Sequence, residues 1–381
     1  MIVMSIAWAT LAAWLYLLAA RDGFWLASER DEGPSPAPAQ WPRVVAVVPA
    51  RDEADVIGRS IGSLLRQAYP GTFRAIMVDD ESSDDTARVA RDEAMRHGSD
   101  QLTVIAGKPR PPGWTGKLWA MAQGIEQAGE TDYLWLTDAD IGHAPDNLLR
   151  LVARSEADGL VLHSLMVRLR CESLAEHALI PAFVLFFQML YPFQRVNRPT
   201  SKLAAAAGGC MLVSADALAR AGGIKVIADA LIDDCALGAA LKRQGPIRLA
   251  LTRQAESLRS YGGWRGICAM IARSAYAQLK YSPVILAGTL LALALLFLAP
   301  PLLTIFAYGD AQIIGIVSWT VMAIIAQPML AHYRVSPLWG VAMPAIGTAY
   351  GAATLISALQ HWRGRGGLWK GRVQAQLGGE H

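Results

Sequence analysis

Hydrophobic and polar positions divide the chain into two apolar ends and a middle region of alternating pattern. Residues 2–20 form an uncharged run, and three apolar stretches near the C-terminus cover 284–306, 311–330 and 337–359. About 20 consecutive apolar residues are long enough to cross a bilayer as a helix. The pattern therefore predicts N-terminal and C-terminal transmembrane helices, and Pro300-Pro301 is expected to break the first C-terminal stretch.

The middle region alternates short apolar runs with segments of helical periodicity. The apolar runs, which suit strands buried on both faces of a parallel sheet, are 43–48, 74–78, 102–105, 132–137 and 160–167. Apolar positions between the first two runs recur at helical spacing and stop at Tyr69-Pro70-Gly71, and residues 82–85 offer short polar side chains that cap the next helix. This alternation predicts an α/β fold with a doubly wound, mostly parallel sheet, which binds ligands at the carboxyl ends of its strands.

Changes in composition predict five segments. Residues 1–21 are interpreted as a membrane anchor, 22–42 as a polar linker with a Pro-Ser-Pro-Ala-Pro core, 43–282 as the α/β domain with interfacial helices, 283–360 as a C-terminal transmembrane region and 361–381 as a basic tail. No Lys or Arg precedes the first apolar run. The run therefore lacks the basic start of a secretory signal, and we expect it to be retained.

Positive charges predict the orientation of the chain in an inner membrane of the bacterial type. Arg21, Arg30 and Arg43 follow the anchor, and the positive-inside rule then places the α/β domain in the cytoplasm. Three C-terminal crossings would put the basic tail outside, against its charge. A re-entrant stretch would remove this conflict, and we favour a cytoplasmic tail.

Composition narrows the class of protein. The chain of 381 residues is 53% hydrophobic and its formal net charge is only +3, so no nucleic-acid partner is expected. Cys171, Cys210, Cys235 and Cys268 have neither CxxC nor metal-ligand spacing, and we expect free thiols in a reducing compartment. His143, His163 and His177 have no His or Cys partner at a spacing that suggests zinc, and His163, in an apolar run, is interpreted as a core residue.

Acidic residues follow three of the predicted strands. The strand ends lead into Pro49-Ala-Arg-Asp-Glu53, Asp79-Asp-Glu-Ser-Ser-Asp-Asp-Thr86 and Asp138-Ala-Asp140. None of these segments has the glycine pattern of a dinucleotide site or a P-loop. Two carboxylates two residues apart suit Mg²⁺ or Mn²⁺ that carries a diphosphate. The alternative for Asp138 and Asp140 is a solvated pair that closes a strand.

These motifs, with two later ones, resemble the inverting GT-A glycosyltransferases of family 2. The matching segments, in family order, are residues 47–53, 78–86, 138–140, 207–217 and 232–238. Within that family, residues 112–119 and 369–372 are similar to the hopanoid-associated and carotenoid glycosyltransferase branch, and ceramide glucosyltransferases are a more distant likeness. The resemblance implies a GT-A fold, a UDP-sugar donor and a divalent metal.

The resemblance also assigns residues to the donor. The residues assigned to the nucleotide-sugar are Pro49, Ala50, Arg51, Glu53, Asp80, Lys117 and Asp138. Asp80 and Glu53 would bind the uracil and the ribose, while Asp140, helped by Asp138, would hold Mg²⁺ or Mn²⁺ on the diphosphate. Lys117 would bring a second positive charge to the phosphates, and the alternative is an exposed lysine at the start of a helix.

On the acceptor side, the resemblance makes Asp234 the general base that takes the proton of the attacking hydroxyl. Asp233 stands where the family usually has Glu, so the division of roles between Asp233 and Asp234 is open. A helix N-terminus that favours two carboxylates is the alternative explanation for the pair. Gly208 and Gly209 lie in the segment similar to the acceptor-side loop.

One motif of many membrane-bound family members, (Gln/Arg)-x-x-Arg-Trp, is incomplete in this chain. Arg273 is present for a contact with the diphosphate, but Ser274 replaces the tryptophan. Trp264 is one possible substitute, and Trp369 with Arg372 is another if the tail folds back. Processive polysaccharide synthesis, which depends on this motif, is therefore disfavoured.

Two further segments point to a membrane-resident acceptor. Residues 178–193 are uncharged and nearly apolar, which suits an interfacial or re-entrant element, with a buried core helix as the alternative. A helix over residues 262–281 would align Arg265, Arg273 and Lys280 in a basic stripe. Such a stripe suits an anionic membrane surface or is an ordinary solvated face.

The sequence thus predicts a membrane-bound glycosyltransferase that moves one sugar from a UDP-sugar to a lipid hydroxyl with inversion. A hopanoid-type acceptor is favoured from the family likeness, and polyprenyl phosphate or a ceramide-like lipid is the alternative. A lipid or sugar-lipid transporter with a regulatory domain is the non-enzyme alternative. It is disfavoured because the apolar stretches contain no charged residue that would mark a transport pathway.

Overall fold

The computed structural model describes residues 1–369, 372 and 373, and it divides the chain into two compact units. One unit contains residues 29–170 and 195–260, and the other contains residues 1–28, 171–194 and 261 onward. Lys370, Gly371 and residues 374–381 of the predicted tail lie outside the described residues, as do the side chains of Trp369 and Arg372. Both units are built from segments that are far apart in the sequence, and each is described separately below.

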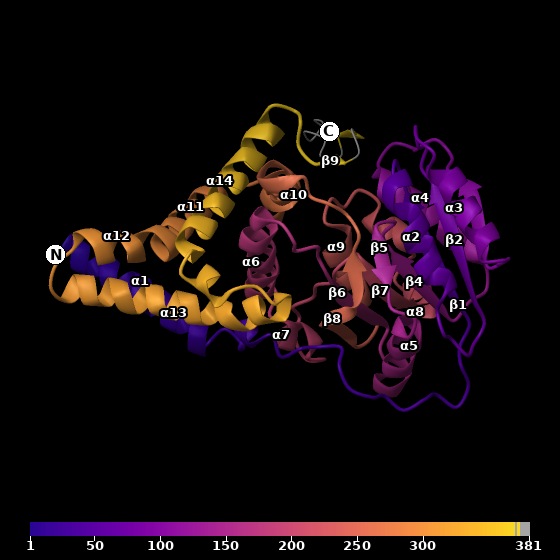
Figure 1. Cartoon of the computed structure of the whole chain (residues 1–381), viewed down its shortest axis with the longest axis horizontal. Coiled ribbons are helices and arrows are strands. Elements are labelled where there is room, and N and C mark those ends of the chain that lie inside the picture. The colour runs from indigo at the N-terminus through magenta and orange to yellow at the C-terminus, as the bar shows by residue number, and fades with distance from the viewer. Residues whose placement is uncertain (370–371, 374–381) are drawn as a thin grey trace. The chain divides into compact units, whose positions relative to one another are not determined.

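The first unit is built on a mixed eight-stranded sheet with the order β3-β2-β1-β4-β7-β6-β8-β5 (Figure 1). The strands are β1 (Val44–Ala50), β2 (Phe73–Asp79), β3 (Leu102–Ala106), β4 (Tyr133–Thr137), β5 (Ile141–His143), β6 (Leu162–Arg168), β7 (Cys210–Ser214) and β8 (Ile247–Ser257). β1 pairs in parallel with both β2 and β4, whereas β7 is antiparallel to both β4 and β6. The five predicted strands and the α/β fold class are confirmed.

The helices of this unit follow the strands and bury one apolar side each. They are α2 (Ala54–Leu65), α3 (Thr86–Arg96), α4 (Gly116–Ala128), α5 (Asn147–Asp158), α8 (Ala215–Arg220) and α9 (Asp233–Leu241), with the 3₁₀ turn η2 (Ile224–Ile227). The short α7 (Phe193–Asn197) begins in the other unit and enters this one at Arg195. Ile57, Ile61 and Leu64 of α2 are fully buried in the core, as the helical spacing predicts. The polar residues before α3 serve its first N–H, because Asp84 accepts a hydrogen bond from the Thr86 N–H (3.0 Å), but the N-cap residue, Asp85, makes no side-chain capping hydrogen bond.

Part of the predicted linker is bound to the sheet of the same unit. The Asp31 N–H donates to the Leu251 carbonyl and the Leu251 N–H donates to the Glu29 carbonyl, both at 2.8 Å. Arg30 thereby forms a parallel bridge with Leu251 of β8. Main-chain hydrogen bonds thus fix residues 29–31, which follow the N-terminal apolar helix, to β8.

The second unit is almost entirely helical. Its elements are α1 (Ile2–Ala19), η1 (Phe24–Leu26), α6 (Leu174–Leu190), α10 (Gly263–Gln278), α11 (Pro283–Leu293), the π segment η3 (Ala294–Leu298), α12 (Ala299–Phe306), α13 (Asp310–Tyr333), η4 (Pro337–Gly340), α14 (Met343–Trp362) and a hairpin of β9 (Leu368–Trp369) and β10 (Arg372–Val373). α1, α12 and α13 lie side by side (Figure 1). Among the described residues, three helices are long and apolar enough to span a membrane: Ile2–Ala19, Pro283–Phe306 and Asp310–Tyr333.

Two expectations about the C-terminal stretches need correction. The third stretch, residues 337–359, forms η4 and α14, and α14 is not among the helices that qualify as spans in the described part of the chain. Pro300-Pro301 does not break the first stretch, because the helix continues through the π segment, in which the Ala299 N–H donates to the Ala294 carbonyl. A π turn inside a helix accommodates residues that cannot join the regular ladder.

The π segment has carbonyls that α1 satisfies. Leu295 and Leu296 would find their donors near Pro300-Pro301, which contribute no N–H. Instead, the Thr10 hydroxyl donates to the Leu295 carbonyl and the Trp14 indole N–H donates to the Leu296 carbonyl, both at 2.9 Å. In an apolar environment an unpaired carbonyl is costly, so these two contacts hold α1 against the irregular part of the candidate span Pro283–Phe306.

The two elements predicted to lie at the membrane surface also differ in detail from expectation. α6 begins with a capping box of Ser173 and Glu176 and is mostly buried among α10, α13 and α14, which fits the alternative of a buried core helix. α10 ends at Gln278, and Lys280 has a φ angle of 53° outside the helix. Lys280 therefore does not extend the predicted stripe of Arg265 and Arg273.

Candidate active site

The carboxyl ends of β1, β2 and β4 lie next to one another. Ala50 of β1 is opposite Asp79 of β2, and Val47 of β1 is opposite Leu136 of β4. The three acidic motifs follow directly after these strands. Residues from all three motifs therefore meet at one edge of the sheet, where α/β sheets bind ligands.

The loops after β1 and β2 are joined by hydrogen bonds between their polar residues. The Glu53 N–H donates to the Thr86 hydroxyl (2.8 Å), and the Ser83 N–H donates to the Asp52 carboxylate (2.7 Å). Asp52 and Glu81 have positive φ angles of 50° and 53°, which are uncommon for residues other than glycine. Such conformations persist only where neighbouring contacts hold them, and they gather at functional sites.

Asp80 is a buried carboxylate at the end of β2, with 1% of its surface exposed. Its N–H donates to the Ala50 carbonyl (2.8 Å), which fixes it beside β1. The Arg51 guanidinium contacts the Asp80 carbonyl, and its Nη1 lies 3.8 Å from the carboxylate Oδ2. Arg51 therefore compensates a charge that would otherwise be costly to bury.

Asp138 and Asp140 leave β4 in a tight turn. The Ile141 N–H donates to the Asp138 carbonyl (3.3 Å), and the Leu258 N–H donates to the Asp140 carbonyl (2.8 Å), which ties the end of β8 to the motif. Burial and the charges of Asp138 and Glu53 raise the pKa of Asp140 to about 6. The three carboxylates therefore create a concentrated negative potential.

This group of carboxylates fits a divalent cation that is shared with a ligand. Within the described part of the chain, no three His, Cys, Asp or Glu side chains form a complete metal cage. Mg²⁺ and Mn²⁺ at phosphate sites usually take only one or two carboxylates and complete their shell with phosphate oxygens and water. Asp138 and Asp140 have the donor chemistry for that arrangement.

Lys117 lies between the two predicted pairs of aspartates. It is the second residue of α4, whose N-cap Thr115 accepts a hydrogen bond from the Leu118 N–H (3.3 Å). The Lys117 ammonium lies 2.8 Å from Asp138 Oδ1 and 3.1 Å from Asp233 Oδ2, and its side chain is 18% exposed. Burial lowers the pKa of Lys117, but the charges of Asp138 and Asp233 outweigh it and raise the pKa above its usual value. The alternative of an exposed lysine does not fit this position.

Asp234, in the first turn of α9, is held by two main-chain donors. The Gly208 N–H donates to Oδ2 (3.0 Å) and the Cys235 N–H donates to Oδ1 (2.7 Å). Burial and the charge of Asp233 raise the pKa of Asp234 to about 6, against the opposing effect of Lys117. A carboxylate whose pKa lies closer to neutrality is a better proton acceptor in this range than an ordinary aspartate.

The two predicted glycines connect the end of β4 to α9. Gly209 accepts a hydrogen bond from the Thr137 hydroxyl (2.9 Å), and a Cβ added to it would lie 3.0 Å from Val167. A Cβ added to Gly208 would lie 3.4 Å from the Lys117 ammonium. The lack of a side chain at Gly208 therefore leaves room beside both Lys117 and Asp234.

Other predicted residues are placed differently. Pro49 and Ala50 are buried within β1, and their predicted contacts with the nucleotide-sugar stay predictions. Arg273 belongs to α10 of the helical unit, as does Trp264, and their predicted contacts with the diphosphate stay predictions. His163 is fully buried, and burial together with the charge of Arg248 lowers its pKa to about 3, which confirms a neutral core histidine.

Sequence analysis missed Arg259 as a site residue. Its positive charge opposes the rise of the Asp140 pKa. Arg259 follows β8, a strand that the apolar pattern did not predict, so no strand end marked its position. Had β8 been predicted, a basic residue shortly after its end would have marked Arg259 as a candidate site residue.

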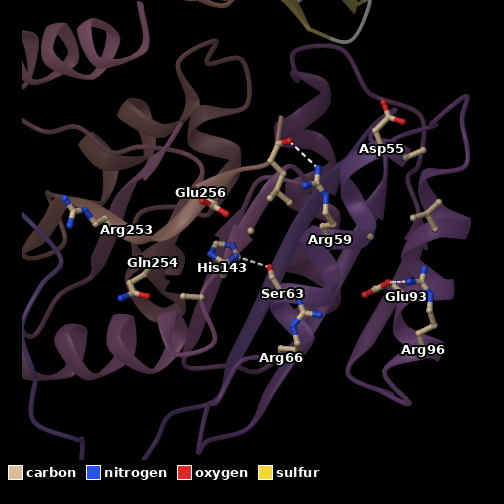
Figure 2. Close-up of a pocket in the computed structure, with 16 residues that line it drawn as sticks. Asp55, Arg59, Ser63, Arg66, Glu93, Arg96, His143, Arg253, Gln254 and Glu256 are labelled. Carbon is tan, nitrogen blue, oxygen red and sulfur yellow. Dashed lines mark hydrogen bonds and ion pairs between the residues drawn. The ribbon is translucent and has the colours of Figure 1, made fainter. Parts of the chain in front are cut away.

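A separate groove of about 710 Å³ lies between α2, α3, β5 and β8. Figure 2 shows Arg59, Arg66 and Arg96 along this groove, with Glu93 paired to Arg96 and Ser63 bonded to His143. None of the predicted site residues lines it. The grouping of charged residues at the carboxyl edge, and not this hollow, therefore locates the candidate site.

Comparisons with known proteins agree with this location. The sequence profile described as "Glycosyl transferase family 2" matches residues 45–222, a stretch that contains the ends of β1, β2 and β4. The match to this family supports a family 2 glycosyltransferase. The protein is therefore an enzyme of the glycosyltransferase class, which acts on a nucleotide-sugar donor.

Two of the similar solved structures are glycosyltransferases by their printed names. The mannosyltransferase PcManGT from Pyrobaculum calidifontis, in complex with GDP-Man and Mn²⁺, is 21% identical, with a TM-score of 0.56, over 94% of this chain and 99% of its own. Glucosyl-3-phosphoglycerate synthase from Mycobacterium tuberculosis is 19% identical, with a TM-score of 0.35, over 55% of this chain and 70% of its own. No curated protein matches the sequence. The likeness to PcManGT shows a GT-A-like fold.

Proposed function

We propose that the enzyme transfers a single sugar from a UDP-sugar to a hydroxyl group of a membrane lipid, with inversion at the anomeric carbon. A hopanoid-type acceptor is the favoured lipid. The observation that carries the proposal is the meeting of two aspartate pairs at Lys117, because a transferase of this kind needs one group for the diphosphate and another for the acceptor proton. Asp138 and Asp140 suit the first task, and Asp233 and Asp234 suit the second.

In the proposed reaction, Asp234 accepts the proton of the acceptor hydroxyl as its oxygen attacks the anomeric carbon. The bond between that carbon and the diphosphate oxygen breaks, and UDP leaves with the bonding electrons. Attack from the face opposite the leaving group inverts the configuration. The hydrogen bonds from Gly208 and Cys235 orient the Asp234 carboxylate for this role, and general-base assistance contributes roughly 10²–10⁴ in rate.

On the donor side, the proposed roles follow from the charges already described. Asp80 and Glu53 accept hydrogen bonds from the base and the ribose, and the Arg51 contact keeps Asp80 in place. Asp138 and Asp140 would hold Mg²⁺ or Mn²⁺. Such a cation supplies charge neutralisation to the diphosphate when it is bound. Lys117 brings a further positive charge to the same side of the site.

The membrane topology is part of the proposal. Two candidate C-terminal spans, Pro283–Phe306 and Asp310–Tyr333, would return the chain to the side on which the domain after α1 lies. The positively charged residues 361–372 would then be cytoplasmic, which removes the charge conflict of a third crossing. Fusion of a periplasmic or a cytoplasmic reporter after His381 tests this arrangement, and only the cytoplasmic reporter should be active.

A phosphate acceptor is the alternative within the enzyme class. A polyprenyl phosphate is already a nucleophile and needs no general base, whereas a hopanoid or ceramide-like hydroxyl does.

GDP-mannose is a second candidate donor, because the similar PcManGT structure contains it. The transporter alternative loses its basis, because the domain between the apolar helices is a glycosyltransferase.

The deciding experiment measures nucleoside diphosphate release by the detergent-purified enzyme, with UDP-sugars and GDP-mannose, Mg²⁺ or Mn²⁺, and extracted membrane lipid. Lipid-stimulated UDP release should fall by about 10²–10⁴ in Asp234→Asn and should also be lost in Asp140→Asn. The exposed Asp216→Asn provides the control, since Asp216 pairs only with Arg220 on the surface of α8 among the contacts described.

Three results would contradict parts of the proposal. Full activity of Asp234→Asn on a polyprenyl phosphate would favour the phosphate acceptor. Release of GDP but not UDP would replace the donor. An α-linked lipid product from an α-linked donor, identified by the anomeric coupling in its NMR spectrum, would exclude inversion.

A further inference from the structure

Lys117 makes two short ionic contacts that no single ligand-binding role explains. One reaches Asp138, on the side proposed for the metal, and the other reaches Asp233, beside the proposed base. In the same structure, Asp234 accepts two main-chain hydrogen bonds, while Asp233 has the Lys117 ammonium as a counter-ion. Lys117 therefore connects the donor half of the site to the acceptor half.

The contact with Asp138 also creates a competition. A divalent cation and the Lys117 ammonium both need the Asp138 carboxylate, and Lys117 holds Oδ1 at 2.8 Å. A lysine ammonium is a point charge on a flexible stem, so it can exchange one anionic partner for another at little structural cost. Gly208 leaves space next to the ammonium, because even a Cβ there would lie 3.4 Å away.

A nucleoside diphosphate offers Lys117 a new anionic partner. Its phosphates carry negative charge, and they would arrive at the carboxyl edge of the sheet where Lys117 already lies. A move of the ammonium towards the phosphates would free Asp138 for the cation and leave Asp233 without its counter-ion. The added negative charge of Asp233 would then favour proton uptake by the adjacent Asp234.

We propose that Lys117 is an exchangeable counter-ion that joins Asp138 to Asp233 in the donor-free enzyme and moves to the diphosphate when the donor binds. This inference rests on the proposed function, and it adds an order of events. The donor and the metal enter together, and only then does Asp233 lose its counter-ion, which makes the adjacent base Asp234 the stronger proton acceptor. When no donor is present, water and acceptor hydroxyls therefore meet an aspartate pair whose charge Lys117 partly compensates.

The test separates metal binding from nucleotide binding in the full-length enzyme in detergent. Mn²⁺ affinity is measured by electron paramagnetic resonance without nucleotide, and UDP and GDP affinity is measured by calorimetry with EDTA. The variants are Lys117→Met, which removes the charge, and Lys117→Arg, which keeps it. Lys225→Met on η2 is the control for loss of an exposed lysine charge, and thermal unfolding of each variant checks the fold.

The proposal predicts changes of opposite sign in Lys117→Met. Mn²⁺ alone should bind about tenfold more tightly, because Asp138 loses its competitor, and the nucleoside diphosphate should bind about tenfold more weakly, a size typical of coupling between ligand sites. Lys117→Arg should remain near the wild type for Mn²⁺, and Lys225→Met should change neither affinity.

Other outcomes of these measurements would contradict either the exchange or the proposed function. Weaker nucleotide binding with unchanged Mn²⁺ affinity would make Lys117 a simple phosphate ligand and overturn the exchange. A loss of both affinities would make it a structural residue and also overturn the exchange. If the wild type binds neither UDP nor GDP, either with EDTA or with saturating Mn²⁺, the proposed function fails. The Mn²⁺ comparison, which uses no nucleotide, then decides alone whether Lys117 competes with a cation for Asp138.

Discussion

Asp234 and Asp140 are placed in similar surroundings although they belong to different motifs. Each has an acidic neighbour, each is crowded by protein, and each has its pKa raised to about 6. Crowded like charges of this kind are unfavourable for folding and are typical of functional sites. The charges that relieve them, Lys117 and Arg259, come from segments remote in the sequence.

The pKa of Asp234 leads to a pH dependence of the reaction. Because a general base must be deprotonated, kcat/KM of the wild type at saturating metal should be constant above pH 7 and fall about tenfold per pH unit well below about pH 6. Asp233→Asn removes the like charge and should move this acidic limb to lower pH. The measurement is the pH profile of kcat/KM for both enzymes, with Asp216→Asn as the reference. An unshifted limb in Asp233→Asn would show that Asp234 does not set it.

Residue type and spacing were enough to predict the aspartates of the site, because short acidic motifs at strand ends are a local signal. The partners of those aspartates were not predictable in the same way. Arg51 and Asp80 are 29 positions apart and Lys117 and Asp233 are 116 apart, and no spacing rule connects such pairs. Only the register of the parallel strands and the start of α4 bring them together.

Among the elements, α4 carries Lys117 and also packs on the sheet, so its distance from β1 matters for the site. Gly124 faces the sheet, and a Cβ added there would lie 2.4 Å from Val47 and 3.1 Å from Val78. The helix can approach β1 closely only because this position has no side chain. Helix propensity alone would favour alanine here, so packing decides the residue.

Gly124→Ala should therefore destabilise the enzyme by about 1–3 kcal/mol despite the better helix propensity of alanine. The measurement is the unfolding midpoint in denaturant, followed by the tryptophans of this unit. Gly58→Ala on α2 is the matched comparison, because its added Cβ meets only Val89, at 3.2 Å, and the effect should be smaller. Equal effects of the two substitutions would contradict a special role for the α4 contact.

β8 shows where the apolar pattern was insufficient. Leu249, Ala250 and Leu251 are buried, but Arg248 and Arg253 interrupt the run on either side. A short apolar segment between charged residues does not distinguish a strand from a loop. The long-range pairing with β6 and β5 makes it a strand, and that pairing is a tertiary effect.

In the helical unit, Trp14 of α1 contacts the Phe297 ring and donates a hydrogen bond to the Leu296 carbonyl. Trp14→Phe keeps the aromatic contact with Phe297 but removes the N–H that serves the Leu296 carbonyl, and it should cost about 1–2 kcal/mol. The check is the thermal unfolding midpoint in detergent, with Trp8→Phe on an exposed face of α1 as the control. If both variants unfold at the same temperature as the wild type, the hydrogen bond has no stabilising role.

At the scale of the whole molecule, the chain passes between its two units more than once. Residues 171–194 leave the α/β unit to form α6 and then return to it at Arg195. Composition suggested one continuous domain over residues 43–282, because periodicity describes single elements and does not reveal which unit an apolar helix joins. Only the contacts between residues show that segments of the two units alternate along the chain.

This connectivity predicts how fragments will behave. A fragment of residues 29–260 should aggregate or require detergent, because α6 would lose α10, α13 and α14 and expose Leu179, Ile180 and Leu185. The same fragment with residues 171–194 replaced by a Gly-Ser linker should be soluble. Size-exclusion chromatography without detergent compares the two, and equal solubility would contradict the burial of α6 in the helical unit.

The contact of Thr10 and Trp14 with the π segment has a consequence for biosynthesis. These residues are translated long before the carbonyls that they serve, which are 285 and 282 positions later. The polar groups of α1 therefore lack their final partners while the whole α/β unit is translated. Assembly of the helical unit is thus a late event, and the α/β unit has time to fold before α1 packs against the π segment.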